Sequence, residues 1–148
     1  MSSNPIGIFD SGIGGLTIAH AIKEKLPNEN IIYFGDTKHL PYGEKSDVAI
    51  KDYSLKITKF LEKKGCKIII IACNSASSVA FNYIIKNINS IPIFNVIDPV
   101  INSLSNKYEG KKIGVIGTKA TIKSNIYQEK IKRKIFSSKV TSLETPLL

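Results

Sequence analysis

The segment IIIIACNSAS, residues 68–77, places four consecutive isoleucines directly before an alanine, a cysteine, an asparagine and a serine. Consecutive β-branched residues are typical of a strand that is covered on both faces, as in a parallel sheet between layers of helices. Residues 75–87, SASSVAFNYIIKN, have the pattern of a helix. The segment therefore predicts a buried strand followed at once by a helix, with Cys73, Asn74 and Ser75 at the junction.

The same alternation of strand and helix runs along the whole chain. Strands are predicted at residues 6–10, 31–36, 67–72, 91–96, 112–117 and 139–144, and further helices at residues 15–27, 45–64 and about 121–135. The expected apolar faces are Leu16, Ala19, Ile22 and Leu26 in the first of these helices, and Ile50, Tyr53, Ile57 and Phe60 in the second. Strands that alternate with helices form βαβ units, so we predict an α/β protein with a doubly wound parallel sheet.

The composition is that of a globular protein, with 43% hydrophobic and 22% charged residues in a chain of 148. The net charge of +9 is unevenly placed, because nine of the 21 Lys and Arg residues lie between residues 111 and 139. A basic segment of this kind can bind nucleic acid. Neither aromatic residues nor glycines are interleaved with the charges of KIKRK, residues 130–134, as a stacking platform would need. We therefore favour a solvated helix face and expect no nucleic-acid partner.

The start of the chain and its two cysteines bear on its location. The first residues, MSSNPIGIFD, lack the basic region of a signal peptide, and no apolar run approaches the ~20 residues that span a bilayer. Cys66 and Cys73 are then expected to be free thiols in a reducing cytoplasm. Their places at opposite ends of one predicted strand give no ligand spacing, so no metal site is predicted.

Small polar residues follow several of the predicted strands. They are Asp10 and Ser11, Asp36, Cys73 to Ser75, and Thr118. In open α/β sheets, ligands bind beyond the carboxyl ends of the strands. These residues therefore predict a site for a small, polar, charged metabolite.

Cys73 has the position of a reactive thiol. It follows a strand and precedes a helix, and a helix N-terminus is expected to lower the pKa of a thiol. A small buried apolar residue is the alternative interpretation of any free cysteine. Cys66 precedes the strand, at the opposite edge of the sheet, and is predicted to be structural. Neither His20, inside a predicted helix, nor His39, in a loop, is fixed near Cys73 by any pattern in the sequence.

Two further patterns concern glycines and an internal repeat. DSGIGG, residues 10–15, does not match a dinucleotide-binding fingerprint, because its third glycine would fall at Thr17. Its glycines are expected to turn the backbone sharply behind Asp10 and to bring the next helix close. IGIFDSGIGGLT, residues 6–17, is related to IGVIGTKATIKS, residues 113–124, with the proline of VIDPV as a break between them. The repeat predicts a second, related α/β unit that begins near Asp98.

Four segments, taken together, resemble the glutamate racemase family. They are GIFDSGIGGLT, YFGDTKHLPYG, IACNSAS and GVIGTKATIKS, in this order along the chain. The resemblance implies two pseudo-symmetric α/β domains with a site in the cleft between them. It also implies cofactor-independent interconversion of L- and D-glutamate for peptidoglycan, by two cysteines that act on opposite faces of the substrate. A homodimer is the expected state of the full-length protein.

The resemblance assigns roles to individual residues. Cys73 is expected to deprotonate the D-enantiomer, and Asp10 and Ser11 to hold the ammonium group, with Asp10 assisting proton transfer. The residues expected to bind the carboxylates and the amine are Tyr42, Gly43, Asn74, Ser75, Thr118 and Thr121. No cofactor or metal is implied.

The family's second motif, a Gly-Cys-Thr-His stretch, is absent from this sequence. The offset of 107 residues between the repeats would place its cysteine near position 180, beyond Leu148. We therefore expect residues 1–97 to form a first domain without its closing elements, residues 98–148 to begin a truncated second domain, and the chain alone to be inactive. The alternatives are a racemase for another acidic amino acid, such as aspartate, and a non-catalytic basic binding fragment.

Overall fold

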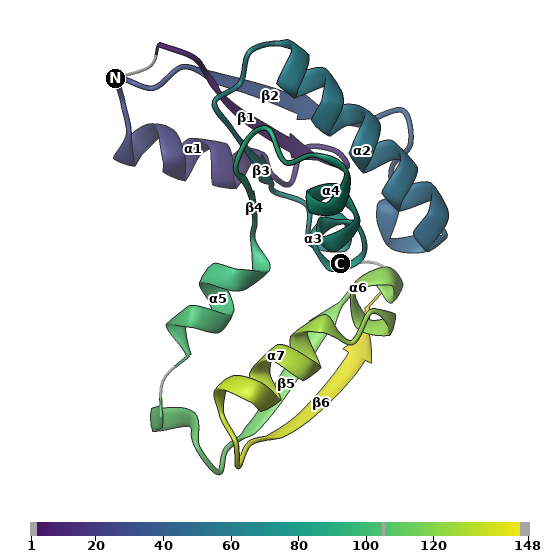
Figure 1. The fold of residues 1–148 in the computed structure, drawn as a ribbon. Helices are drawn as coiled ribbons and strands as arrows, with labels where there is room; N and C mark the ends of the chain where they lie inside the picture. Colours follow the sequence, from purple (N-terminus) through teal and green to yellow (C-terminus); the bar gives the residue numbers. More distant parts are fainter. Residues whose placement is uncertain (1–2, 105, 146–148) are drawn as a thin grey trace.

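The computed structural model describes residues 3–104 and 106–145, which form two parallel sheets (Figure 1). The first sheet has the order β2-β1-β3-β4, and the second pairs β5 with β6. The strands are β1 (Ile6–Asp10), β2 (Ile31–Gly35), β3 (Ile68–Ile71), β4 (Ile93–Asn95), β5 (Lys112–Gly117) and β6 (Lys139–Glu144). All six predicted strands are therefore present. Residues 1–2, 105 and 146–148 lie outside the described residues. They include parts of the chain start and of the predicted second unit.

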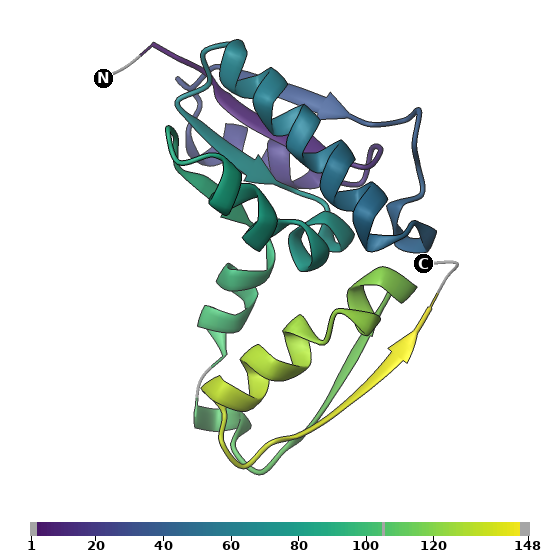
Figure 2. The same cartoon turned by 45° about the vertical axis from the view of Figure 1, so that its right-hand side comes forward.

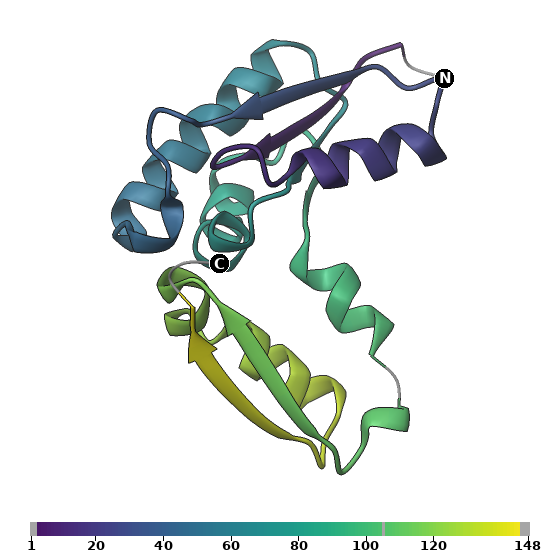
Figure 3. The same cartoon turned by 180° about the vertical axis from the view of Figure 1, so that it is seen from behind.

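Helices connect the strands and cover the four-stranded sheet on both faces (Figures 1 and 3). They are α1 (Leu16–Lys25), α2 (Asp47–Lys63), α3 (Asn74–Val79), α4 (Phe81–Asn87), α5 (Ile97–Ser103), α6 (Lys119–Lys123) and α7 (Ile126–Lys134), with short 3-10 turns η1 (Tyr42–Glu44) and η2 (Asn106–Tyr108). This arrangement confirms the predicted α/β fold with a doubly wound parallel sheet.

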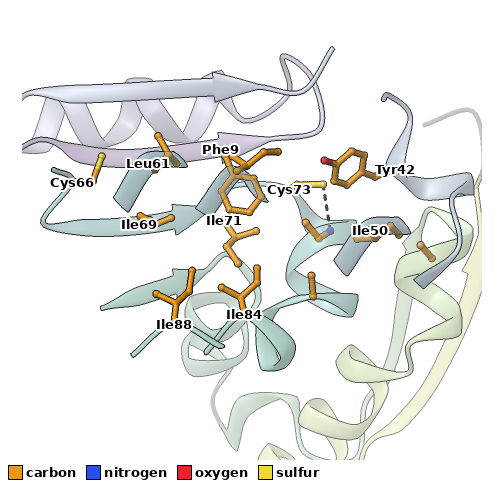
Figure 4. Packing of buried hydrophobic residues seen from close by; sticks show 14 residues of the cluster. Phe9, Tyr42, Ile50, Leu61, Cys66, Ile69, Ile71, Cys73, Ile84 and Ile88 are labelled. Carbon is orange, nitrogen blue, oxygen red and sulfur yellow. Dashed lines mark hydrogen bonds between the residues drawn. The ribbon is translucent and has the colours of Figure 1, made fainter. Parts of the chain in front are cut away.

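Alternation along the strands divides the first core into two layers. Ile6 and Ile8 of β1 face α1, whereas Phe9 faces the larger cluster beneath α2, α3 and α4. Ile69 and Ile71 of β3 belong to the same larger cluster and are fully buried (Figure 4). Because both faces of the sheet are covered, the isoleucine run of β3 needs no polar residue on either side.

Two expected helix faces differ in detail from the structure. In α1, Ile18, Ala19 and Ile22 pack on the sheet, whereas Leu16 and Leu26 are exposed, since they lie at the ends of the helix. In α2, Leu61 is buried in place of Phe60. Phe60 instead makes an edge contact with Phe34, at 5.5 Å between ring centroids.

Two predicted helices are interrupted. Residues 75–87 form α3 and α4, which meet at Ala80. The helix predicted at 121–135 is instead α6 and α7, separated by Asn125 with φ of 57°. Asparagine tolerates this left-handed conformation better than most residues, so the chain changes direction here. The break allows α7 to pack along β5 and β6 beside α5.

The second unit lies below the first and is joined to it through α5 (Figure 2). Pro99, expected to mark a break, lies in the first turn of α5, where a missing N–H costs little. The face of β5 and β6 that carries Ile113, Val115 and Val140 packs on α5 and α7. On the other face, Ile116 and Leu143 are paired across the ladder, and each is 64% exposed. The division at residues 97 and 98 stays a prediction about domains.

Candidate active site

The carboxylate of Asp10 is fixed by the loop that follows β1. Its Oδ2 accepts hydrogen bonds from the backbone N–H groups of Gly12 and Gly15, both at 3.1 Å. Gly15 is required by close packing, since a Cβ there would lie 2.7 Å from the Cβ of Asp10. Tyr33 holds the same loop by donating to the carbonyl of Gly12 at 3.1 Å. The expected close approach of the next helix is therefore present at Gly15.

The pKa of the Tyr33 phenol is affected by its burial and by the charges of this site. Burial raises the pKa of Tyr33 to about 12, with smaller contributions from the negative charges of Asp10 and Cys73. Tyr33 therefore keeps the proton that it donates to the loop even above pH 10, where an ordinary tyrosine loses it.

Cys73 is the N-cap residue of α3. Its Sγ accepts from the backbone N–H of Ala76 at 3.4 Å (Figure 4). The same Sγ lies 3.5 Å from the Oγ of Ser11. The expected lowering of its pKa is wrong. Cys73 is only 5% exposed, and burial raises the pKa of its thiol, assisted by the negative charge of Asp10. The hydrogen bonds from Ser11 and Ala76 oppose this shift without reversing it.

Cys66 lies at the other end of β3 (Figure 4). It is buried beneath β1, where a Cβ added to Gly7 would lie 3.0 Å from its Sγ. Both cysteines are free thiols. The structure therefore separates Cys66 from the carboxyl ends of the strands, where the candidate site residues lie, as expected.

A chain of hydroxyl groups joins the two sheets. Ser75 Oγ lies 2.8 Å from Thr118 Oγ1, which lies 3.1 Å from Thr121 Oγ1. Thr118 is also the N-cap residue of α6, and its Oγ1 accepts from the N–H of Thr121. Gly43 packs on the same threonine so closely that a Cβ would lie 2.5 Å from the Cβ of Thr118. The junction between the two units thus depends on small and hydroxyl-bearing residues.

The side chain of Tyr42 takes part in a buried network of its own. Tyr42 is 1% exposed, and its hydroxyl donates to Oδ2 of Asp36 at 2.6 Å. His39 binds the same carboxylate through Nδ1 at 2.8 Å and stacks on Tyr53. Burial, followed by the hydrogen bond to Asp36, raises the pKa of Tyr42 well above its ordinary value. Asp36 therefore secures the loop that carries Tyr42 and Gly43.

One cavity of about 360 Å³ collects most of the predicted site residues. Those that line it are Asp10, Ser11, Cys73, Asn74, Ser75 and Thr118. Three predicted residues lie behind this wall: Tyr42 is turned toward Asp36, and Gly43 and Thr121 pack against Thr118. The wall also contains residues that were not predicted, namely Gly12, Ile13, Gly14, Leu40 and Pro41. They lie within two of the segments that resemble the racemase family, GIFDSGIGGLT and YFGDTKHLPYG, in the loops that follow β1 and β2.

A larger cavity of about 490 Å³ shares Asn74 and Thr118 with the first. Its walls are mainly apolar side chains of α5, β5 and α7, such as Ile101, Val115 and Ile131. We assign the candidate site to the smaller cavity because the thiol, the carboxylate and the hydroxyl groups converge there.

Comparison with known proteins identifies the family. A family model described as Asp/Glu/Hydantoin racemase matches residues 16–146. The chain belongs to this family. It is 48% identical over 129 residues to a glutamate racemase of Corynebacterium diphtheriae, covering 87% of this chain and 48% of that protein. A glutamate racemase of Streptococcus thermophilus is 42% identical over 146 residues, which is 99% of this chain and 54% of that protein.

Solved structures agree with the sequence comparison. The glutamate racemase of Francisella tularensis, solved in complex with D-glutamate, superposes with a TM-score of 0.87 at 42% identity, covering 96% of this chain and 53% of that one. The chain therefore spans about half the length of the relatives that it matches.

Neither a membrane span nor a metal cluster is found in the described part of the chain. No helix there combines the length and the apolar character needed to cross a bilayer. No group of three or more His, Cys, Asp or Glu side chains there is placed to hold a metal ion.

Proposed function

We propose that this chain provides one half of a glutamate racemase active site, in which Cys73 is the base on one face of the substrate. The main support is the cavity that places Cys73 beside Asp10, Ser11 and Thr118. A glutamate racemase of Streptococcus thermophilus matches almost all of this chain, and so does that of Francisella tularensis, which was solved with D-glutamate.

The polar groups of the cavity match the charges of an acidic amino acid. The carboxylate of Asp10 uses Oδ2 for the loop N–H groups and keeps Oδ1 for an ammonium group. Asn74, Ser75 and Thr118 offer an amide and hydroxyl groups to carboxylates, which only accept hydrogen bonds. The Cys73 thiol donates to the Oγ of Ser11 at 3.5 Å, and once the thiol is deprotonated the Ser11 hydroxyl stabilises the thiolate by donating in the reverse direction.

The proton transfer follows from this placement. The thiolate of Cys73 takes the Cα proton, which leaves a thiol and a carbanion whose charge spreads into the adjacent carboxylate. Inversion then needs a proton from an acid on the opposite face, while return of the proton from Cys73 restores the original enantiomer. Because the Cα proton is very weakly acidic, fixed hydrogen bonds and exclusion of water must stabilise the carbanion.

The raised pKa of Cys73 suits a base but limits the population of thiolate. A more basic thiolate removes a weakly acidic proton more readily, whereas fewer molecules carry the thiolate at neutral pH. The substrate's ammonium group, held by Asp10, places a positive charge near Cys73 and offsets part of the effect of Asp10. Substrate binding and thiolate formation should therefore support each other.

We propose that the acid on the face of the substrate opposite Cys73 is supplied by a residue outside this 148-residue chain. Cys66 is the other cysteine of the sequence, and it is buried at the far end of β3. We therefore infer that the chain alone does not racemise glutamate. We further propose that the full-length protein is a homodimer, that it acts in the cytoplasm, and that it supplies D-glutamate for peptidoglycan.

The test is binding of D-glutamate to the 148-residue chain, measured by calorimetry alongside D-aspartate. The proposal expects saturable binding of D-glutamate that Asp10→Asn weakens, because the ammonium group loses a charged partner. Tighter binding of D-aspartate would favour the alternative acidic substrate. Absence of binding to either amino acid would refute a substrate half-site in this chain.

A further inference from the structure

Tyr127, in the first turn of α7, makes a hydrogen bond across the two units. Its hydroxyl donates to Oδ1 of Asn74 at 2.7 Å, although the two residues are 53 positions apart. This distance is typical of an O–H···O hydrogen bond and is short for an N–H···O bond. The phenol ring packs with α5, β5 and α7, so its position is fixed by the core of the second unit.

The bond determines which end of the Asn74 amide is left for a ligand. An asparagine side chain has one accepting oxygen and one donating NH2 group, and it can rotate to present either. Tyr127 occupies the oxygen, and no hydrogen bond of Nδ2 is found among the described residues. Asn74 lines both cavities, whereas Tyr127 lines only the larger one, so the Asn74 side chain stands at the boundary between the larger cavity and the candidate site.

We propose that Tyr127 is a positioning residue that holds Asn74 with its NH2 group available to a carboxylate of the substrate. The proposal rests on the proposed function, which makes the ligand an acidic amino acid. A carboxylate accepts hydrogen bonds only, so an Asn74 amide turned the other way would place oxygen against oxygen. Tyr127 thereby selects anionic ligands without touching them.

The surroundings of Tyr127 maintain this arrangement. The phenol of Tyr127 is half-buried, and burial raises its pKa, while its hydrogen bond to Asn74 lies at an exposed position. Asn74 is anchored from its backbone as well, because its carbonyl accepts from the Oγ of Ser78 at 2.7 Å. The backbone of Asn74 is fixed in α3, so its side-chain amide can still rotate. The hydrogen bond from Tyr127 restricts this rotation.

The first test is a double-substitution cycle with D-glutamate as the probe. Tyr127→Phe removes only the hydroxyl, and it should weaken binding roughly 3- to 10-fold because the amide is no longer held in one orientation. In an Asn74→Ala background, the same substitution should change affinity by less than about 2-fold, since its target is gone. Tyr83→Phe, on an exposed residue of α4, is the matched control and should not affect binding.

The cycle separates positioning from a general structural effect. An equal loss of affinity from Tyr127→Phe in both backgrounds would overturn the proposal, because the effect would then not pass through Asn74. Unchanged affinity in the Tyr127→Phe variant would overturn it as well.

The second test needs no ligand, so it decides the proposal even if the chain fails to bind glutamate. The side-chain NH2 signals of Asn74 are assigned in a ¹⁵N-labelled chain by their loss in Asn74→Ala. They should shift or broaden in Tyr127→Phe, as the amide samples both orientations, and stay in place in Tyr83→Phe. Unaltered Asn74 signals in Tyr127→Phe would show that the hydroxyl does not orient the amide. Failure to bind with altered signals would count against the proposed function alone.

Discussion

At the scale of single residues, the site is governed by how each polar group is held. Asp10 accepts two backbone hydrogen bonds, and Cys73 is buried beside it with one N–H donor. Asp36 is equally buried but binds Tyr42 and His39. Of these three residues, Asp10 and Cys73 face the cavity, whereas Asp36 holds the loop that carries Tyr42.

The two cysteines should differ sharply in their effect on catalysis. In a chimera that continues this chain with the second half of the Francisella tularensis enzyme, Cys73→Ser should abolish racemisation, because a serine hydroxyl is far too weakly acidic to supply the base. Cys66→Ser should leave activity nearly unchanged apart from some loss of stability. Chiral chromatography of D-glutamate measures both, and similar losses in the two variants would contradict the assignment.

The network around Tyr42 predicts a dependence of stability on pH. The folded state raises the pKa of this phenol above its ordinary value of 10.0, so the folded chain binds more protons than the unfolded chain once the pH passes 10. Stability contributed by Tyr42 is therefore complete below pH 10 and is lost as the pH rises further. Cys73 acts in the same sense above its ordinary value of 9.0.

Tyr42→Phe tests this dependence. It should cost about 1–3 kcal/mol at pH 7, because the buried carboxylate of Asp36 loses a donor. It should also reduce the loss of stability between pH 10 and 11. Urea denaturation at several pH values measures both effects. Curves for the wild type and the variant that stay parallel above pH 10 would contradict the argument.

At the scale of secondary-structure elements, periodicity was enough to locate the strands but not the helix breaks. The β-branched runs predict every strand of the described chain, and parallel pairing then brings Asp10 and Cys73 to one edge. The break at Asn125 depends on one residue in a left-handed conformation, which the sequence pattern of residues 121–135 does not reveal.

Side-chain direction and burial were also beyond the sequence. Tyr42 belongs to a predicted site segment, yet its hydroxyl is turned to Asp36, since a partner deep in the core decides its direction. The contact between Tyr127 and Asn74 joins residues 53 positions apart. The pKa of Cys73 rises because desolvation outweighs the hydrogen bonds from Ser11 and Ala76, a balance that only the packed structure shows.

The contact between η1 and α6 predicts a strong effect of one small substitution. Gly43→Ala would place a Cβ 2.5 Å from the Cβ of Thr118, so η1 and α6 must move apart. We expect a loss of about 1–3 kcal/mol in the free energy of unfolding. Gly114→Ala, where an added Cβ meets open space, is the control and should be nearly neutral. Equal stabilities of the two variants in urea would contradict this packing.

At the scale of the whole molecule, the two units are unequally covered. The first sheet has helices on both faces, whereas the face of β5 and β6 with Ile116 and Leu143 is open in the described structure (Figure 2). The basic segment of α7, on the other face of this sheet, is partly neutralised, since Lys130 pairs with Asp98 and Arg133 lies near Glu129. The absence of a nucleic-acid partner stays a prediction.

The open face predicts association of the isolated chain. Adjacent exposed apolar residues on an unpaired sheet favour contacts between molecules. Ile116→Thr should reduce concentration-dependent association, measured by sedimentation velocity, while keeping a β-branched residue in β5. Val48→Thr, at a residue of α2 that is 77% exposed, should not reduce it. A wild-type chain that stays monomeric at all concentrations would contradict the prediction.

The central claim is that Cys73 is a base for one face of glutamate and that the opposite acid lies outside these residues. The most direct measurement is incubation of D-glutamate with the purified chain in D2O, with Cys73→Ala as the control. NMR follows deuterium at Cα, and chiral chromatography follows configuration. We predict that no L-glutamate accumulates, and that any deuterium exchange requires Cys73 and retains the D configuration. Accumulation of L-glutamate that depends on Cys73 would contradict the account, because these residues would then supply acids to both faces.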